Sequence, residues 1–174
     1  MKRHHLLMLV AIVATMAEGQ AANIPVVLPT IANADFETGA AGFTTFPGYT
    51  GGANPAEITS WPGAGGRGIN PGTGAGTPFR DNGNNTSNVA FLQGNATTIG
   101  QLITGWEVGE NYRIAFDYNA RNASGGNTSP FAGITAAIGG AMFIDSAVPP
   151  AGGSNSYYAG NILFTPTMDT NTLS

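Results

Sequence analysis

The sequence contains no cysteine, so no disulfide bond can stabilise its fold. Its one lysine, Lys2, and both of its histidines, His4 and His5, lie within the first five residues. A chain that loses this N-terminal stretch therefore keeps no thiol, imidazole or side-chain amine. Serine–histidine and cysteine–histidine catalysis, lysine Schiff bases, and zinc sites built from imidazole or thiolate are then excluded. Carboxylates remain as ordinary acid–base groups and as oxygen ligands for a hard cation such as Ca²⁺.

Charged residues are scarce, and basic ones more so than acidic ones. The chain has six basic and ten acidic residues and a net charge of −4. Without residues 1–21, four arginines face nine acidic residues. A protein that binds polyanions needs clustered lysine and arginine to neutralise phosphates. This composition argues against nucleic acid and against an anionic membrane surface as partners.

The N-terminus has the three parts of a secretory signal peptide. Lys2 and Arg3 form a basic start, residues 6–17 form an apolar run, and small residues surround Ala21. The run is shorter than the roughly 20 apolar residues that span a bilayer. We therefore predict a signal peptide at 1–21 and one soluble domain at 22–174, secreted or at the cell surface, without membrane insertion after cleavage. The alternative is an uncleaved N-terminal anchor.

The rest of the chain indicates an all-β fold. No stretch keeps a helical repeat of apolar residues, whereas several short segments alternate with period two or are rich in β-branched and aromatic residues between turn signals. In the clearest segment, residues 111–122, Tyr112, Ile114 and Phe116 fall on one face and Arg113 and Asp117 on the other. We predict an antiparallel β-sandwich rather than a barrel. The expected strands or extended segments are 24–37, 58–61, 68–70, 88–93, 97–103, 111–122, 133–138, 141–148 and, as the last, 157–165, with a hairpin turn at 139–140.

A series of motifs occurs in a recognisable order. They are Asn33-Ala34-Asp35-Phe36-Glu37, Ser60-Trp61, Gly68-Ile69-Asn70-Pro71, Asn88-Val89-Ala90-Phe91-Leu92-Gln93-Gly94, Ile99-Gly100-Gln101-Leu102, and the run from Val108 to Arg121. This series resembles the galactose-binding-like jelly-roll domains of secreted bacterial proteins, some of which carry C-terminal exosortase-type sorting signals. The resemblance covers most of residues 22–174. It implies a two-sheet jelly roll of the kind shared by many carbohydrate-binding modules.

The resemblance also implies a structural calcium ion near the N-terminal Phe-Glu segment. Glu37 matches the first part of that site, and Asp35, two residues earlier on an extended segment, shares its face. In the family, an aspartate on a last strand closes the site. The sequence given stops at Ser174, before such a strand, so we expect either a fragment or a domain that ends early. The alternative for Asp35 and Glu37 is an exposed acidic turn.

Carbohydrate-binding residues are expected on the loops and on the polar face of residues 111–122. Trp61 can offer an indole face to a sugar ring, or it can be a core anchor. Planar amide, guanidinium and carboxylate groups suit sugar hydroxyls. The candidates are Trp61, Asn70, Arg80, Asp81, Asn119 and Arg121. The alternative for Arg121, or for Arg113, is a local salt bridge with Asp117.

These observations favour a non-catalytic binding domain for a polysaccharide or a cell-surface glycan. A glycosidase needs two carboxyl groups opposed across a cleft, and the spacing of the acidic residues indicates no such pair. We therefore do not expect an enzyme. The second hypothesis is a structural or adhesive surface protein without a soluble ligand, which self-associates through its sheets.

Overall fold

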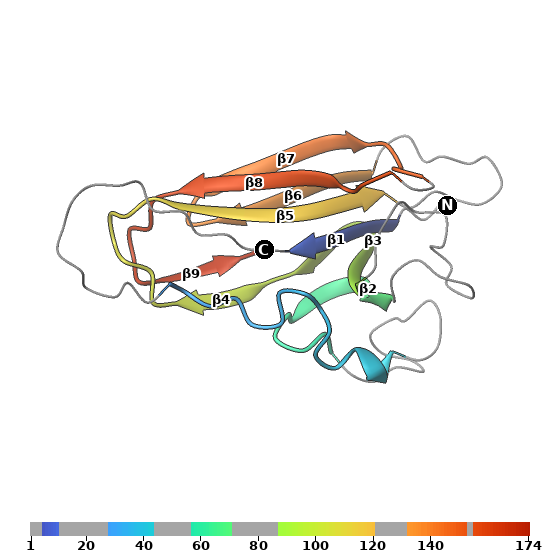
Figure 1. Ribbon diagram of the computed structural model, residues 1–174, viewed down its shortest axis with the longest axis horizontal. Coiled ribbons are helices and arrows are strands. Elements are labelled where there is room, and N and C mark those ends of the chain that lie inside the picture. Colours follow the sequence, from blue (N-terminus) through green and yellow to red (C-terminus); the bar gives the residue numbers. More distant parts are fainter. Residues whose placement is uncertain (1–4, 11–27, 44–56, 71–86, 121–131, 153–154) are drawn as a thin grey trace.

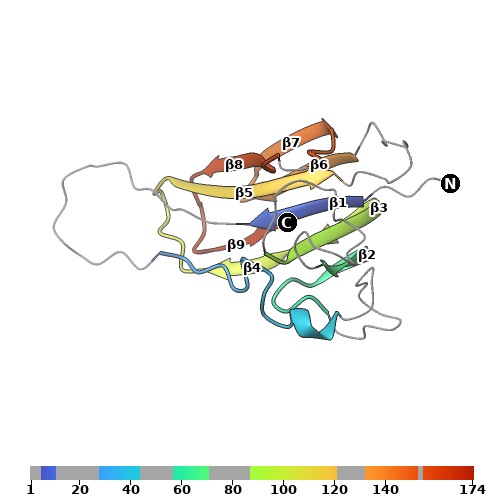
Figure 2. The same ribbon diagram turned by 45° about the vertical axis from the view of Figure 1, so that its right-hand side comes forward.

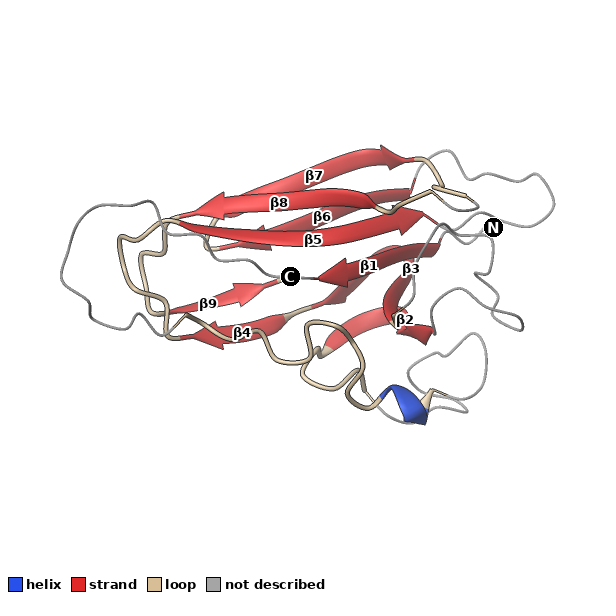
Figure 3. Cartoon of the chain, viewed as in Figure 1, coloured by secondary structure: helices blue, strands red, loops and turns tan. Residues whose placement is uncertain are grey.

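The computed structural model describes residues 5–10, 28–43, 57–70, 87–120, 132–152 and 155–174. Strands dominate these residues, and they form two antiparallel sheets that pack as a sandwich (Figures 1 and 3). The predicted all-β antiparallel sandwich is confirmed. Within the described part of the chain, no helix is both long enough and apolar enough to cross a membrane. The elements are β1 (His5–Val10), the 3-10 helix η1 (Ala40–Gly42), β2 (Gly63–Asn70), β3 (Val89–Ile99), β4 (Gln101–Thr104), β5 (Tyr112–Ala120), β6 (Ala132–Ile138), β7 (Ala141–Val148), β8 (Tyr158–Phe164) and β9 (Thr170–Leu173).

The chain passes repeatedly from one sheet to the other. The first sheet has the strand order β2-β3-β1-β5-β8, and the second has the order β4-β9-β6-β7. β3 ends at Ile99 in the first sheet, and β4 begins two residues later in the second (Figure 2). β8 is paired with β5 over its whole length in the first sheet, from Tyr112–Phe164 to Tyr118–Tyr158. This pairing aligns their outward-facing side chains in rows across the two strands.

The hairpin between β6 and β7 forms where the sequence predicts it. Gly139 and Gly140 both have positive φ angles, 54° and 83°. A tight two-residue turn between antiparallel strands requires this backbone conformation, and glycine adopts it without strain. The expected bounds of β7, residues 141–148, agree with the structure.

The core lies between the two sheets and is strongly aromatic at both ends. Trp106 packs edge-on against Tyr112 and Phe164, with ring centroids 4.8 Å apart in each pair. Further along β5, Phe116 and Tyr118 pack against Phe143 of β7 at 5.2 and 5.3 Å. The contacts with Phe143 join the two sheets, and both groups use the apolar face of β5 that the sequence pattern predicts.

Residues 5–10 form the central strand of the five-stranded sheet, which the sequence analysis does not anticipate. β1 pairs antiparallel with β3 on one side and with β5 on the other. A short, continuous apolar run has no periodicity that distinguishes a strand from a helix. The same residues can therefore serve as the apolar part of a leader and as a strand in the uncut chain.

Other expectations also differ from the structure. The predicted strand 97–103 is divided at Gly100 between the end of β3 and β4, which lie in different sheets. Residues 58–61 form a turn, in which the Trp61 backbone N–H donates to the Ile58 carbonyl at 2.9 Å, and not a strand. Within 24–37, the described residues 28–37 contain no strand: residues 32–35 form turns, and Asn33 and Phe36 have positive φ angles that interrupt an extended chain. The strand 157–165 is followed by another, β9, whose short polar sequence lacks a strand pattern.

Candidate functional site

Two amide side chains of the sequence motifs, Gln101 and Asn33, join separate segments of the chain. The Gln101 side chain, 7% exposed, accepts from the Ala32 N–H at 2.8 Å and donates to the carbonyls of Ala32 and Ser60. Asn33 bonds through its side chain to backbone atoms of Thr38 and Thr59. These amides attach residues 28–43 to the turn at 58–61 and to β4. Their hydrogen bonds connect segments that are distant in the sequence.

Trp61 belongs to this structural set. Its side chain is 1% exposed, its Nε1–H donates to the Asn33 carbonyl at 2.9 Å, and its ring lies 5.5 Å from that of Phe36. A buried indole has no free face for a sugar ring. The structure corrects the prediction of a stacking platform and supports the alternative, a core anchor.

Glu37 joins the segment 28–43 to Asn88, the residue directly before β3. Its two carboxylate oxygens accept hydrogen bonds from the Asn88 backbone N–H and side-chain amide at 2.9 and 2.5 Å. One oxygen of Asp35 accepts from the Glu37 backbone N–H at 3.2 Å. Among the residues that the structure describes, no group of three or more acidic, histidine or cysteine side chains is placed to hold a metal. These residues fit a calcium cage poorly, because an ion would have to displace Asn88 from Glu37.

Two of the other predicted carbohydrate-binding residues are buried. Asn119 is fully buried, accepts from the Ala151 N–H at 2.8 Å and donates to the Ala151 carbonyl at 3.2 Å. It therefore holds the segment after β7 against the first sheet. Asn70, at the end of β2, is also fully buried. Arg80, Asp81 and Arg121 lie outside the described residues, and the three members of the expected set that the structure describes, Trp61, Asn70 and Asn119, are all buried.

An exposed strip lies on the outer face of β5 and β8, beside the position of Asn119. The register pairs Arg113 with Leu163, Ala115 with Asn161, and Asp117 with Ala159. Alternate residues on the same strands, such as Ile114 and Ile162, face the core and are buried. We call the six residues of the three cross-strand pairs the outer strip. The outer strip combines a cation, a carboxylate, an amide and a large apolar side chain with two alanines.

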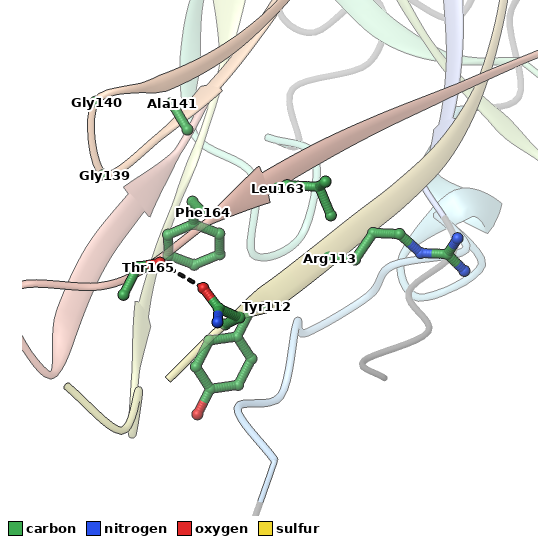
Figure 4. Close-up of a pocket in the computed structure, with 9 residues that line it drawn as sticks. Tyr112, Arg113, Gly139, Gly140, Ala141, Leu163, Phe164 and Thr165 are labelled. Atoms are coloured by element: carbon green, nitrogen blue, oxygen red, sulfur yellow. Dashed lines mark hydrogen bonds between the residues drawn. The ribbon is translucent and has the colours of Figure 1, made fainter. Parts of the chain in front are cut away.

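A pocket of about 490 Å³ adjoins the outer strip at one end of the sandwich. It is formed where β5 begins, where β8 ends and where the β6–β7 hairpin turns (Figure 4). Across it, the Thr165 hydroxyl donates to the Asn111 side-chain oxygen at 2.7 Å. The residues lining this end pocket are Asn111, Tyr112, Arg113, Gly139, Gly140, Ala141, Leu163, Phe164 and Thr165. Arg113 and Leu163 belong to both the pocket and the strip.

Asp117 is the half-buried carboxylate of the outer strip. Burial raises its pKa above the ordinary value of an aspartate. The alternative interpretation of Arg113, a salt bridge with Asp117, is not present, because residues four apart on a strand are separated by about 13 Å. The same alternative for Arg121 lies outside the described residues. In the described part of the chain, the ion pair that forms joins Arg67 to Glu57 instead. Asp117 and Arg113 are therefore separate polar groups, about 13 Å apart along β5.

The sequence shows part of the outer strip but not its other half. Arg113 and Asp117 fall on the predicted polar face of residues 111–122. Asn161 and Leu163 alternate with buried residues in β8 in the same way, and that alternation is the signal that identifies them. Which strand lies beside β5 depends on long-range pairing.

No known protein family, curated protein or solved structure matches this chain.

Proposed function

We propose that this chain is a secreted, non-catalytic binding domain and that its ligand is a carbohydrate. The observation that carries the proposal is the outer strip together with the end pocket. Sugar hydroxyls need donors and acceptors in fixed planes, which arginine, aspartate and asparagine supply. The C–H faces of a sugar ring need an apolar contact, which Leu163, 69% exposed, can make. The motif order that resembles galactose-binding-like domains supports the same ligand class.

The geometry favours an extended glycan over a single sugar. The three cross-strand pairs of the outer strip follow β5 and β8 for five residues, a distance of about 13 Å. A chain of two or three sugar units can lie along such a surface with its end in the pocket. Arg113 and Leu163 would contact the unit that lies where strip and pocket meet. A polysaccharide or cell-surface glycan fits this shape.

The experiment is a glycan array with polysaccharide pull-down, using the secreted protein and two leucine variants. Leu163 and Leu102 are both exposed leucines on strands, at 69% and 65%, but Leu102 lies on β4 in the other sheet. We expect Leu163→Ala to weaken binding of the best glycan at least tenfold, since it loses apolar contact at the centre of the site, and Leu102→Ala to bind as the wild type does. Absence of binding to any glycan, or equal effects of the two substitutions, would overturn the proposal.

A second candidate function is a structural or adhesive protein that self-associates. The observation that favours it is β7, which is the last strand of its sheet. Met142 and Ile144 of β7 are 59% and 63% exposed. An edge strand with exposed apolar side chains is a surface for pairing with another strand. Concentration-dependent association without glycan binding would favour this function over the first.

A further inference from the structure

Arg113 carries a positive charge that no described residue neutralises. Of the two arginines in the described part of the chain, Arg67 is paired with Glu57, whereas Arg113 is exposed and forms no ion pair there. Its neighbours on the same face of β5 and β8 include Ala115, two residues along β5, and Leu163, its cross-strand partner. Neither is charged, so the guanidinium group can accept an anion from outside the chain.

The acidic residues nearest to Arg113 in the sequence do not share its place on the sheet. Glu107 lies in the turn before β5, where its backbone N–H donates to the Tyr112 hydroxyl at 3.1 Å. Tyr112 is buried and points into the core, on the opposite face of β5 from Arg113. Asp117 is on the same face as Arg113, but about 13 Å along the strand. An anion bound at Arg113 would therefore be separated from both of these carboxylates.

The place of Arg113 relative to the end pocket defines what an anion there would be attached to. Figure 4 shows Leu163 between the β6–β7 hairpin and Arg113, with the Arg113 side chain extended away from Phe164 and Thr165. A sugar ring that rests on Leu163 would thus have the pocket on one side and the guanidinium on the other. The guanidinium presents two parallel N–H groups, which match the two oxygens of a carboxylate, whereas a hydroxyl oxygen does not use both in this way. The geometry suits a ring that carries a carboxylate.

We propose that the ligand is an acidic glycan, a polysaccharide that contains uronic acid, and that Arg113 binds the uronate carboxylate while the sugar ring rests on Leu163. The inference depends on the proposed carbohydrate binding and names the class of its ligand. The chain as a whole has a net charge of −4 and no general attraction for polyanions. The preference for an acidic sugar must therefore come from the local contact with Arg113.

The test compares each acidic glycan with a neutral form of the same chain. The probes are polygalacturonate, alginate and hyaluronate, each with free carboxylates and as its methyl ester, and binding is measured by isothermal titration calorimetry. We expect at least one free acid to bind at least tenfold more tightly than its ester, with a smaller difference in high salt, where the ion pair is screened. Arg113→Gln should bind the two forms equally. Arg113→Lys should keep part of the preference, because it keeps the charge but loses the two parallel N–H groups.

Leu102→Glu is the matched control for net charge. It lowers the net charge by one, as Arg113→Gln does, but at an exposed position of β4 in the other sheet. It should keep the preference of the wild type, and melting temperatures of all variants show that they are folded. Equal binding of acid and ester by the wild type, a preference that survives in Arg113→Gln, or an equal loss in Leu102→Glu would overturn the proposal. Binding of a neutral glycan that depends on Leu163 would then leave the proposed function standing, whereas absence of all glycan binding would remove both.

Discussion

At the scale of single residues, amide and indole groups of the motifs serve the fold. Trp61, Gln101 and Asn119 each satisfy backbone atoms of another segment. Replacing Trp61 by alanine would empty a core site and cost about 3–5 kcal/mol. A loss of ligand binding in that variant would therefore report unfolding. Exposed residues of the outer strip are the informative ones to change.

Asp117 should make the stability of the protein depend on pH. Its folded-state pKa is raised by burial, so between the unfolded and folded pKa values the native state binds more protons than the unfolded state does. The free energy of unfolding should therefore fall as pH rises through this window, and the ionised carboxylate should weaken the fold at neutral pH. The Asp117→Asn variant has no carboxyl group at this position, so this contribution to the pH dependence of its stability should be absent.

Urea unfolding of the wild type and of Asp117→Asn, from pH 3 to pH 7, measures this dependence. We expect the two proteins to be closest in stability at pH 3, where both side chains are neutral, and the asparagine variant to gain relative to the wild type as pH rises. A constant difference across the range would show that Asp117 ionises in the folded state as it does in the unfolded chain.

At the scale of elements, the alternation of apolar and polar residues predicts the strands that have one face in the core. The predicted segments 111–122 and 133–148 correspond to β5, β6, β7 and their glycine turn almost to the residue, because more and less exposed side chains alternate along most of each strand. β1 and β9 could not be predicted in this way. The first is uniformly apolar and the second is short and polar, so both owe their conformation to partners distant in sequence. For the same reason, the sequence alone does not show that Asn161 and Leu163 belong to the outer strip, because this depends on the pairing of β8 with β5.

The segment 28–43 has no regular strand, yet it is fixed to β3 through Glu37. Calcium binding at Glu37 stays a prediction, and thermal melting with calcium or with a chelator tests it. A cation bound by the folded state alone must raise the melting temperature. A higher value with calcium, lost in Glu37→Gln, would show that the ion replaces Asn88 on this carboxylate. Equal melting in both buffers would assign Glu37 to its hydrogen bonds with Asn88 alone.

At the scale of the whole molecule, the two sheets present different surfaces to a partner. The first sheet carries the outer strip, with charged and amide groups. The second sheet ends in β7, with Met142 and Ile144 exposed on an edge strand. A protein that binds glycan through the first sheet could thus be assembled through the second. The two proposed functions therefore concern separate surfaces and can be tested separately.

Self-association through β7 should be sensitive to charge on that strand. Ile144→Lys places a cation where a second strand would have to approach, which disfavours edge-to-edge pairing. We expect sedimentation velocity to show association of the wild type that increases with concentration, and monomer for Ile144→Lys. Leu102→Lys is the matched control, because Leu102 is equally exposed on β4 at the opposite edge of the same sheet. Association that survives Ile144→Lys but is lost in Leu102→Lys would place the contact at β4 and remove β7 from the argument.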